Sequence, residues 1–136
     1  MVDLARFSQW VARIAVPFFG GFLGAIGVAL VGYLLGIAGV SALFGVTARP
    51  ITQQSLQNIS WGGAMWGLVP AAFLILKKGN IYLISLFTMI VAVTYGMFVL
   101  FKLPLALTVG TVYTYLVNLT YAIILALTIK AAGFGK

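Results

Sequence analysis

A chain of 136 residues with 63% hydrophobic and 7% charged residues departs from soluble domains, in which about 45–50% of residues are apolar and about 25% are charged. It has the length of one domain, residues 1–136, and it is too apolar for a soluble fold. The formal charge of +7 comes from single cations and one Lys-Lys pair between apolar runs, a spacing that argues against a nucleic-acid-binding surface.

Residues 2–14 have the spacing of an amphipathic helix. We interpret this segment as a helix that lies in the membrane interface, with its basic face toward anionic headgroups. The alternative is that it extends the first membrane span by a few turns. The apolar face holds Leu4, Phe7, Val11 and Ile14, and the polar face holds Arg6, Gln9 and Arg13.

Four long uncharged stretches follow, and each holds about 20 apolar residues, the length that a helix needs to cross about 30 Å of hydrocarbon. Helices are expected because lipid offers the backbone no hydrogen-bond partner, and because the runs do not alternate as barrel strands do. The predicted fold is therefore an all-α integral membrane four-helix bundle. The predicted spans are residues 15–38, 59–76, 81–101 and 107–129.

The longest connection, residues 39–58, holds most of the amide side chains of the chain. Its start, residues 40–46, is apolar but too short to span, so it can form a short interfacial or re-entrant helix. The loop is either a contact surface outside the cytoplasm or a solvated connector in which Asn58 is the N-cap of the second span. Within that span, Pro70 predicts a kink.

The cations are divided unequally between the two sides of the predicted bundle. Six fall on the side of the termini and the second loop, and two fall on the other side. By the positive-inside rule, this asymmetry predicts that both termini are cytoplasmic. The six are Arg6, Arg13, Lys77, Lys78, Lys130 and Lys136, and the two are Arg49 and Lys102.

Glycines recur at a spacing of four residues in the first two predicted spans. A stripe without side chains lets two helix backbones approach closely where lipid gives no hydrophobic drive for association. We therefore predict helix packing along this stripe, either with another helix of the same chain or with another subunit. The residues assigned to it are Gly20, Gly24, Gly27, Gly32, Gly36, Gly63 and Gly67.

Hydroxyl and amide side chains align at helical spacing in the third and fourth predicted spans. They can bond across the bundle or line a narrow polar pathway, although Ser and Thr in membrane helices more often bond their own backbone. Asn118 stands out, because an amide at mid-membrane depth is costly unless it is paired. Trp66 is deep enough to stack a lipid tail, but core packing is the commoner use. The candidate pathway residues are Ser85, Thr88, Tyr95, Thr111, Tyr115 and Asn118.

The chain lacks the side chains of most catalytic and metal sites. It has no His and no Cys, and its one acidic residue is Asp3. General acid–base catalysis needs such groups in a site, and zinc, haem and copper need them as ligands. Proton-coupled exchange needs an intramembrane carboxylate. We therefore expect no enzymatic activity, no catalytic residue, no metal and no cofactor.

The run from Trp61 to Gly67 reads Trp-Gly-Gly-Ala-Met-Trp-Gly. With four spans and this length, the chain resembles a group of uncharacterised bacterial small membrane proteins that carry a Trp-Gly-Gly-x-x-Trp-Gly turn of helix. The resemblance extends over the topology but is specific only over these residues, and it implies no known activity. Multidrug exporters and quinone-linked thiol oxidases with four spans fit less well, because their intramembrane acid and their cysteines are missing here.

Two hypotheses for function follow. The leading one is a non-catalytic membrane protein that acts by helix packing, as an accessory or assembly subunit of a complex or as a homo-oligomer. The alternative is a passive small-solute channel or a lipid-binding protein that uses the polar residues of the third and fourth spans. The expected partners are the bilayer, other transmembrane subunits or a second copy, and lipids, in a bacterial inner membrane.

Overall fold

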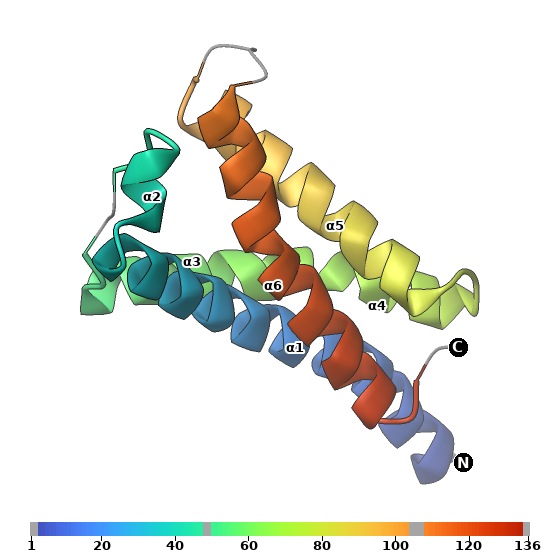
Figure 1. Ribbon diagram of the computed structural model, residues 1–136. Coiled ribbons are helices and arrows are strands. Elements are labelled where there is room, and N and C mark those ends of the chain that lie inside the picture. Colours follow the sequence, from blue (N-terminus) through green and yellow to red (C-terminus); the bar gives the residue numbers. More distant parts are fainter. Residues whose placement is uncertain (1–2, 48–49, 104–107, 135–136) are drawn as a thin grey trace.

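The computed structural model describes residues 3–47, 50–103 and 108–134, and every regular element in these ranges is a helix (Figure 1). Four stretches, residues 4–37, 53–76, 81–100 and 109–131, are long and apolar enough to cross a bilayer. The predicted all-helical fold with four long apolar helices is thus confirmed. The elements are α1 (Leu4–Ile37), α2 (Val40–Leu43), α3 (Gln53–Trp66), α4 (Leu68–Leu76), α5 (Ile81–Tyr95), the π-helical turn η1 (Gly96–Leu100) and α6 (Val109–Ala131).

The first helix, α1, is continuous over 34 residues. Asp3 caps its start, and its carboxylate accepts a hydrogen bond from the N–H of Ala5 (3.0 Å). Gly39, with a φ of +79°, follows its end and turns the chain away. The described part of segment 2–14 is therefore continuous with the first long helix, and residue 2 lies outside the described residues.

The second long stretch starts earlier than predicted. Thr52 and Ser55 form a capping box, in which each hydroxyl oxygen accepts a hydrogen bond from the backbone N–H of the other residue (3.1 and 2.9 Å). Asn58 lies inside α3, so the interpretation of Asn58 as an N-cap is wrong. The helix is interrupted at Gly67, three residues before Pro70. Pro70 has no N–H to bond the carbonyl oxygen four residues before it, and its ring displaces that carbonyl.

The third long stretch ends in a wider turn. Asn80 caps the start of α5, and α5 continues into η1, where the N–H of Phe101 bonds to the carbonyl oxygen of Gly96 (3.0 Å), five residues back. α6 starts after Thr108, whose hydroxyl oxygen accepts a hydrogen bond from the N–H of Thr111 (3.1 Å). The π turn changes the direction in which side chains after Gly96 point, relative to those of α5.

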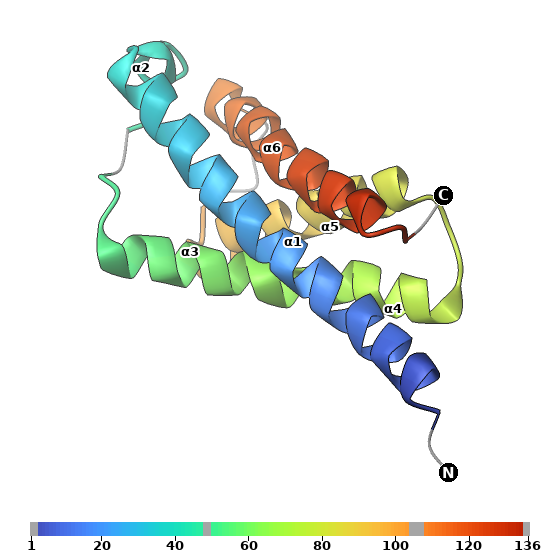
Figure 2. The same ribbon diagram turned by 90° about the horizontal axis from the view of Figure 1, so that it is seen from below.

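The central helix is α1. It crosses α3 and α4 on one side and contacts α6 on another, while α5 packs against α6 and α4 (Figure 2). α1 and α6 are close between residues 20–27 and 120–128, and they diverge toward α2. α2 lies at this open end, where the ring of Phe44 stacks on that of Tyr113 with the centroids 5.1 Å apart.

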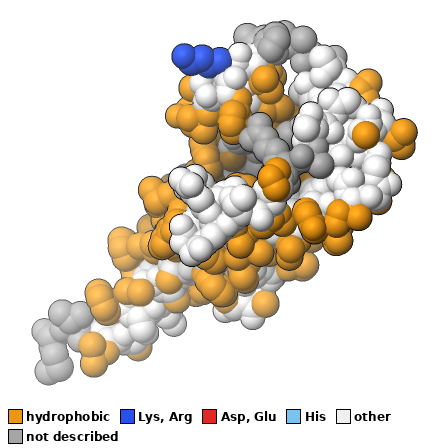
Figure 3. Space-filling model, turned by 90° about the vertical axis from the view of Figure 1, so that its left-hand side faces the viewer, with side chains coloured by type: hydrophobic (Ala, Val, Ile, Leu, Met, Phe, Trp, Pro, Cys, Tyr) orange, Lys and Arg blue, Asp and Glu red, His pale blue; other side chains and the backbone are white. Residues whose placement is uncertain are grey.

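The outer surface of the long helices is apolar. Figure 3 shows hydrophobic side chains along the length of one face, with the Lys or Arg atoms of that face gathered at one edge. Leu34 and Leu83 are 62% and 67% exposed, whereas Ser85 and Thr88 are fully buried. Large apolar residues outside and small polar residues inside are the distribution expected of helices surrounded by lipid.

The two ends of the molecule differ in charge. Both termini and the α4–α5 connection lie at one end, while α2 and η1 lie at the other (Figure 1). Asp3, the one acid of the chain, lies 3.7 Å from Nε of Arg6. Lys102 follows η1 at the second end, and Arg49 and Lys136 lie outside the described residues. The cations of the first end are Arg6, Arg13, Lys77, Lys78 and Lys130.

Candidate functional site

One glycine face of α1 brings its backbone against that of α3 and α4. A Cβ atom on Gly63 would lie 2.6 Å from the carbonyl oxygen of Gly21 and 2.5 Å from Cβ of Ala25. A Cβ atom on Gly67 would collide with the carbonyl oxygen of Pro17. Only glycine therefore permits the observed spacing, and the backbones themselves set how closely α1 and α3 approach.

A second glycine face of α1 meets α6. A Cβ atom on Gly24 would lie 2.9 Å from Cδ2 and 3.0 Å from the carbonyl oxygen of Tyr121, and one on Gly20 would lie 3.1 Å from Cβ of Thr128. A Cβ atom on Gly27 would collide with the side chain of Ile124. The structure thus places Gly20, Gly24, Gly27, Gly63 and Gly67 in contacts within the chain.

The two remaining packing candidates lie near the α2 end of α1. A Cβ atom on Gly32 would meet no heavy atom of the described residues within 4 Å. The carbonyl oxygen of Gly36 accepts a hydrogen bond from the N–H of Gly39 (3.1 Å) in the turn that ends the helix. At Gly32, the predicted stripe is therefore open and not in contact with another described helix.

Tyr121 lies where the two glycine faces meet. Its phenol donates a hydrogen bond of 2.7 Å to the carbonyl oxygen of Gly63, and a Cβ atom on Gly21 would lie 3.0 Å from the same phenol oxygen. We call these three residues the glycine junction. On its α4 side the bundle is filled, since Leu125 and Ile129 are both 0% exposed.

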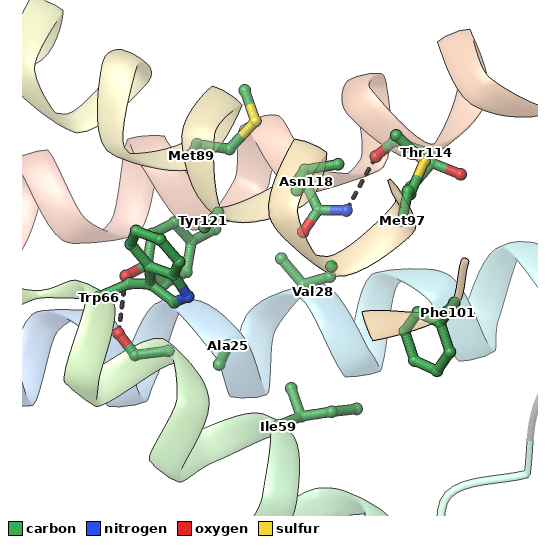
Figure 4. A pocket seen from close by; sticks show the side chains of 14 residues that line it. Ala25, Val28, Ile59, Trp66, Met89, Met97, Phe101, Thr114, Asn118 and Tyr121 are labelled. Carbon is green, nitrogen blue, oxygen red and sulfur yellow. Dashed lines mark hydrogen bonds between the residues drawn. The ribbon is translucent and has the colours of Figure 1, made fainter. Parts of the chain in front are cut away.

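On the α2 side of the glycine junction, the helices line a cavity of about 240 Å³ that is open to the surface (Figure 4). Its lining extends from Trp66 and Tyr121 to Phe101, directly after η1. Ile59 and Phe101 are 44% and 57% exposed, so the cavity reaches the surface of the chain there. Most of the remaining lining is apolar and consists of Ala25, Val28, Met89, Ala92, Val93 and Met97.

Asn118 is the candidate pathway residue that lines this cavity. Its Nδ2 donates a hydrogen bond to the carbonyl oxygen of Thr114 (2.8 Å), and this bond sets the orientation of the amide, because only its NH₂ group can donate. Figure 4 shows Oδ1 on the side away from Thr114. Oδ1 accepts no hydrogen bond from the described residues. The amide thus presents an unmet acceptor in a mostly apolar wall.

Trp66 supplies a second polar atom to the cavity. Its indole lies edge-on to the ring of Tyr95, with centroids 5.9 Å apart and planes at 61°. Figure 4 shows the indole nitrogen on the edge of the ring turned toward Val28. Nε1 donates to no hydrogen-bond acceptor within the described ranges. The lining therefore holds one acceptor without a partner among the described residues, on Asn118, and one such donor, on Trp66, while the hydroxyls of Thr114 and Tyr121 already donate to carbonyl oxygens.

Two of the candidate pathway residues are buried between helices, away from the cavity lining. Thr88 donates a hydrogen bond from its hydroxyl to the carbonyl oxygen of Ile84 (2.8 Å), one turn back. The hydroxyl of Ser85 has no partner among the residues that the structure describes. Neither residue lines the cavity, so the third helix does not carry a polar path from Ser85 toward Asn118.

The other three candidates make separate contacts. Tyr95 is 42% exposed and meets Trp66 as described. The phenol oxygen of Tyr115 lies 2.6 Å from the hydroxyl oxygen of Thr94, and Thr111 bonds Thr108 in the first turn of α6 (3.0 Å). The six predicted residues are thus not brought together around one cavity.

Sequence reasoning did not assign Tyr121 or Thr114 to the site. Both lie on the helix face of Asn118, three residues after it and four before it. Helical spacing from Asn118 is therefore the signal that could have found them. Met97 lies at helical spacing from Met89 and Val93, eight and four residues before it, on the face of α5 and η1 that lines the cavity.

No known protein family, curated protein or solved structure matches the chain. The likeness to bacterial proteins with a Trp-Gly-Gly-x-x-Trp-Gly segment stays a prediction. Within the described ranges, no group of three or more His, Cys, Asp or Glu residues could hold a metal ion. The cavity offers mostly apolar walls and two hydrogen-bonding atoms, on Asn118 and Trp66, that have no partner among the described residues.

Proposed function

We propose that the chain is a non-catalytic integral membrane protein that binds a small apolar or amphiphilic molecule in the cavity beside Asn118. The observation that carries this proposal is a cavity of about 240 Å³ with mostly apolar walls and two polar atoms, on Asn118 and Trp66, left without partners among the described residues. Sites for small molecules have this composition, because apolar walls supply affinity and a few polar groups set orientation.

The packing at the glycine junction favours binding over passage. A channel needs a continuous path lined by polar groups. Here α1, α3 and α6 meet at Gly21, Gly63 and Tyr121, and the fully buried Leu125 and Ile129 fill the space beyond. A molecule in the cavity therefore has no open way through the described part of the bundle.

The glycine contacts also favour binding over a role based on packing alone. The hypothesis of an accessory subunit or homo-oligomer depends on glycine faces that are free to meet another subunit. Gly20, Gly24 and Gly63 already contact helices of the same chain, so they do not argue for an outside partner. Association with other subunits or a second copy stays a prediction. A helix of another subunit could approach at Gly32, where an added Cβ atom would meet no other described helix within 4 Å.

We further propose that the four long helices cross a bacterial inner membrane with both termini in the cytoplasm. Support comes from the apolar outer surface and from the grouping of Arg13, Lys77 and Lys130 at the end that carries the termini. In this orientation, the cavity lies in the half of the bundle farther from the cytoplasm.

Native mass spectrometry from mild detergent tests the proposed binding. We expect a monomer that carries one small molecule retained from the host membrane. Ala92→Phe places a ring in the cavity wall and should abolish the adduct. Val91→Phe is the matched control, because Val91 is 36% exposed and is not part of the lining, and it should keep the adduct.

Two results would contradict this expectation. Either the protein carries no adduct in any preparation, or Ala92→Phe carries the same adduct as Val91→Phe. Equal unfolding curves for the two variants exclude misfolding as the cause of a loss. A second protein at fixed stoichiometry would instead support the accessory-subunit hypothesis.

A further inference from the structure

We infer that the cavity selects an uncharged molecule that ends in a hydroxyl group, a long-chain or cyclic alcohol, with the hydroxyl held by Asn118. This inference rests on the proposed binding function and adds the chemical class of the bound molecule. Three observations carry it: the charge of the lining, the polar atoms of Asn118 and Trp66, and the size of the cavity.

The first observation is that no charged side chain lines the cavity. An ion moved from water into apolar surroundings costs several kcal/mol unless an opposite charge or several hydrogen bonds compensate it. Lys102 follows the rim residue Phe101 in the sequence, but it is exposed and is not part of the lining. A carboxylate, a phosphate or an ammonium group inside the cavity therefore finds no counter-charge.

The second observation is the unmet acceptor of Asn118. Because Nδ2 is directed to the carbonyl oxygen of Thr114, Oδ1 is the atom left for a bound molecule, and it requires a donor. An alkane leaves Oδ1 unsatisfied, and so does an ester or a ketone, because neither can donate. A hydroxyl can donate to Oδ1, and its oxygen can in turn accept a hydrogen bond from a donor of the lining such as Nε1 of Trp66.

The third observation is size. A cavity of about 240 Å³ has room for about eight water molecules at about 30 Å³ each. This volume lies just below the range of about 300–1,000 Å³ for sites that hold drug-sized molecules. The cavity thus accommodates a hydroxyl end and a short apolar part. The rest of a longer molecule can extend out of the cavity at the exposed rim, near Phe101 and Ile59.

Trp66 allows binding to be measured inside the cavity. Replacement of Trp10 and Trp61 by Phe leaves Trp66 as the single tryptophan, since the chain has three. Trp10 is 52% exposed, and Trp61 lies at the surface against Phe18 and Phe22, so neither lines the cavity. Bromine quenches tryptophan fluorescence at short range. The probes are bromodecanol, bromodecane and bromodecanoate with the bromine on the chain, added to the single-tryptophan protein in nanodiscs.

We expect saturable quenching by bromodecanol at a concentration about tenfold lower than for bromodecane, since one hydrogen bond of about 1.4 kcal/mol corresponds to a tenfold change. Ionised bromodecanoate should quench the fluorescence of Trp66 no more strongly than it does in the Ala92→Phe variant, in which the added ring fills the cavity. Asn118→Leu should remove the preference for the alcohol and leave bromodecane unchanged. Asn118→Ala, which adds no bulk, should do the same and serves as the second variant if Asn118→Leu packs poorly.

Equal affinity for bromodecanol and bromodecanoate would overturn the inference, and so would an alcohol preference that survives both Asn118 variants. In either case binding in the cavity would stand. If no probe quenches saturably and Ala92→Phe has no effect, the proposed binding function itself fails, and this result is distinguishable from the other two.

Discussion

Tyr121 on α6 donates a hydrogen bond of 2.7 Å to the carbonyl oxygen of Gly63 on α3, 58 positions earlier in the sequence. The same oxygen accepts the N–H of Gly67 (3.1 Å), so it serves both the helix and the contact between helices. The bond lies between the filled part of the bundle and the cavity. A change at Tyr121 therefore affects the stability of the bundle and the shape of the cavity together.

Removal of this hydroxyl should have a modest effect. In Tyr121→Phe, the carbonyl oxygen of Gly63 keeps its bond from Gly67, so we expect the free energy of unfolding to fall by about 0.6 kcal/mol, the average for such bonds in membrane proteins. Unfolding in mixed micelles with a rising fraction of dodecyl sulfate measures this. Tyr33→Phe is the control, because Tyr33 is 44% exposed. An equal loss in Tyr33→Phe would refute a specific contribution from the Tyr121 bond.

Addition of a methyl group at the glycine junction should be more harmful. A Cβ atom on Gly63 would lie 2.5 Å from Cβ of Ala25, so Gly63→Ala forces α1 and α3 apart and should cost about 1–3 kcal/mol. The neighbouring Gly62→Ala meets nothing within 4 Å among the described residues and should be neutral or stabilising by up to about 1 kcal/mol through helix propensity. The same micelle titration compares the two. If both variants unfold alike, the close approach of α1 and α3 is not the cause.

The stacking of α2 on α6 should protect the start of α6. Phe44→Ala removes the ring that stacks on Tyr113 at 5.1 Å, and we expect a loss of about 0.5–1.5 kcal/mol. Hydrogen exchange should quicken at the backbone of residues 110–113. Leu43→Ala serves as the control because Leu43 is 81% exposed. The prediction fails if exchange in α6 is the same in both variants.

Membrane orientation can be tested directly, because the chain has no cysteine. Ser8→Cys and Ala132→Cys mark the end with the termini, and Thr47→Cys marks the α2 end. In intact cells, we expect a membrane-impermeant thiol reagent to label Thr47→Cys and to spare the other two until the membrane is opened. Labelling of Ser8→Cys in intact cells would reverse the proposed orientation.

The long helices were predictable because length and apolar composition are local properties. The third and fourth spans, predicted at 81–101 and 107–129, correspond to helical stretches at 81–100 and 109–131 that are long and apolar enough to cross a bilayer. The second span was predicted to start at 59, but the helix that contains it starts at 53. The amides before Ile59 are polar and yet compatible with a helix once Thr52 and Ser55 cap the first turn. Hydropathy detects the apolar part of a helix and does not detect a polar first turn.

The cavity was predictable only in part. Asn118 could be singled out because a buried amide needs a partner. The bond of Tyr121 to Gly63 could not, because its acceptor is a backbone atom on a distant helix. The candidate pathway required the polar side chains of the third and fourth spans, Ser85 and Asn118 among them, to face inward along one path. In the structure only Asn118 of the two lines the cavity, and which side chains meet across helices is not encoded in any one segment.

The unequal filling of the two halves of the bundle has a consequence for where bound molecules come from. The buried side chains beyond the glycine junction leave no space for lipid-like guests, and the cavity reaches the surface near Phe101. In a bilayer, the cavity would therefore take up molecules from one leaflet only, and in the proposed orientation this is the outer leaflet. Molecules made on the cytoplasmic side would have to flip across before they could bind, so occupancy would follow the composition of the outer leaflet alone.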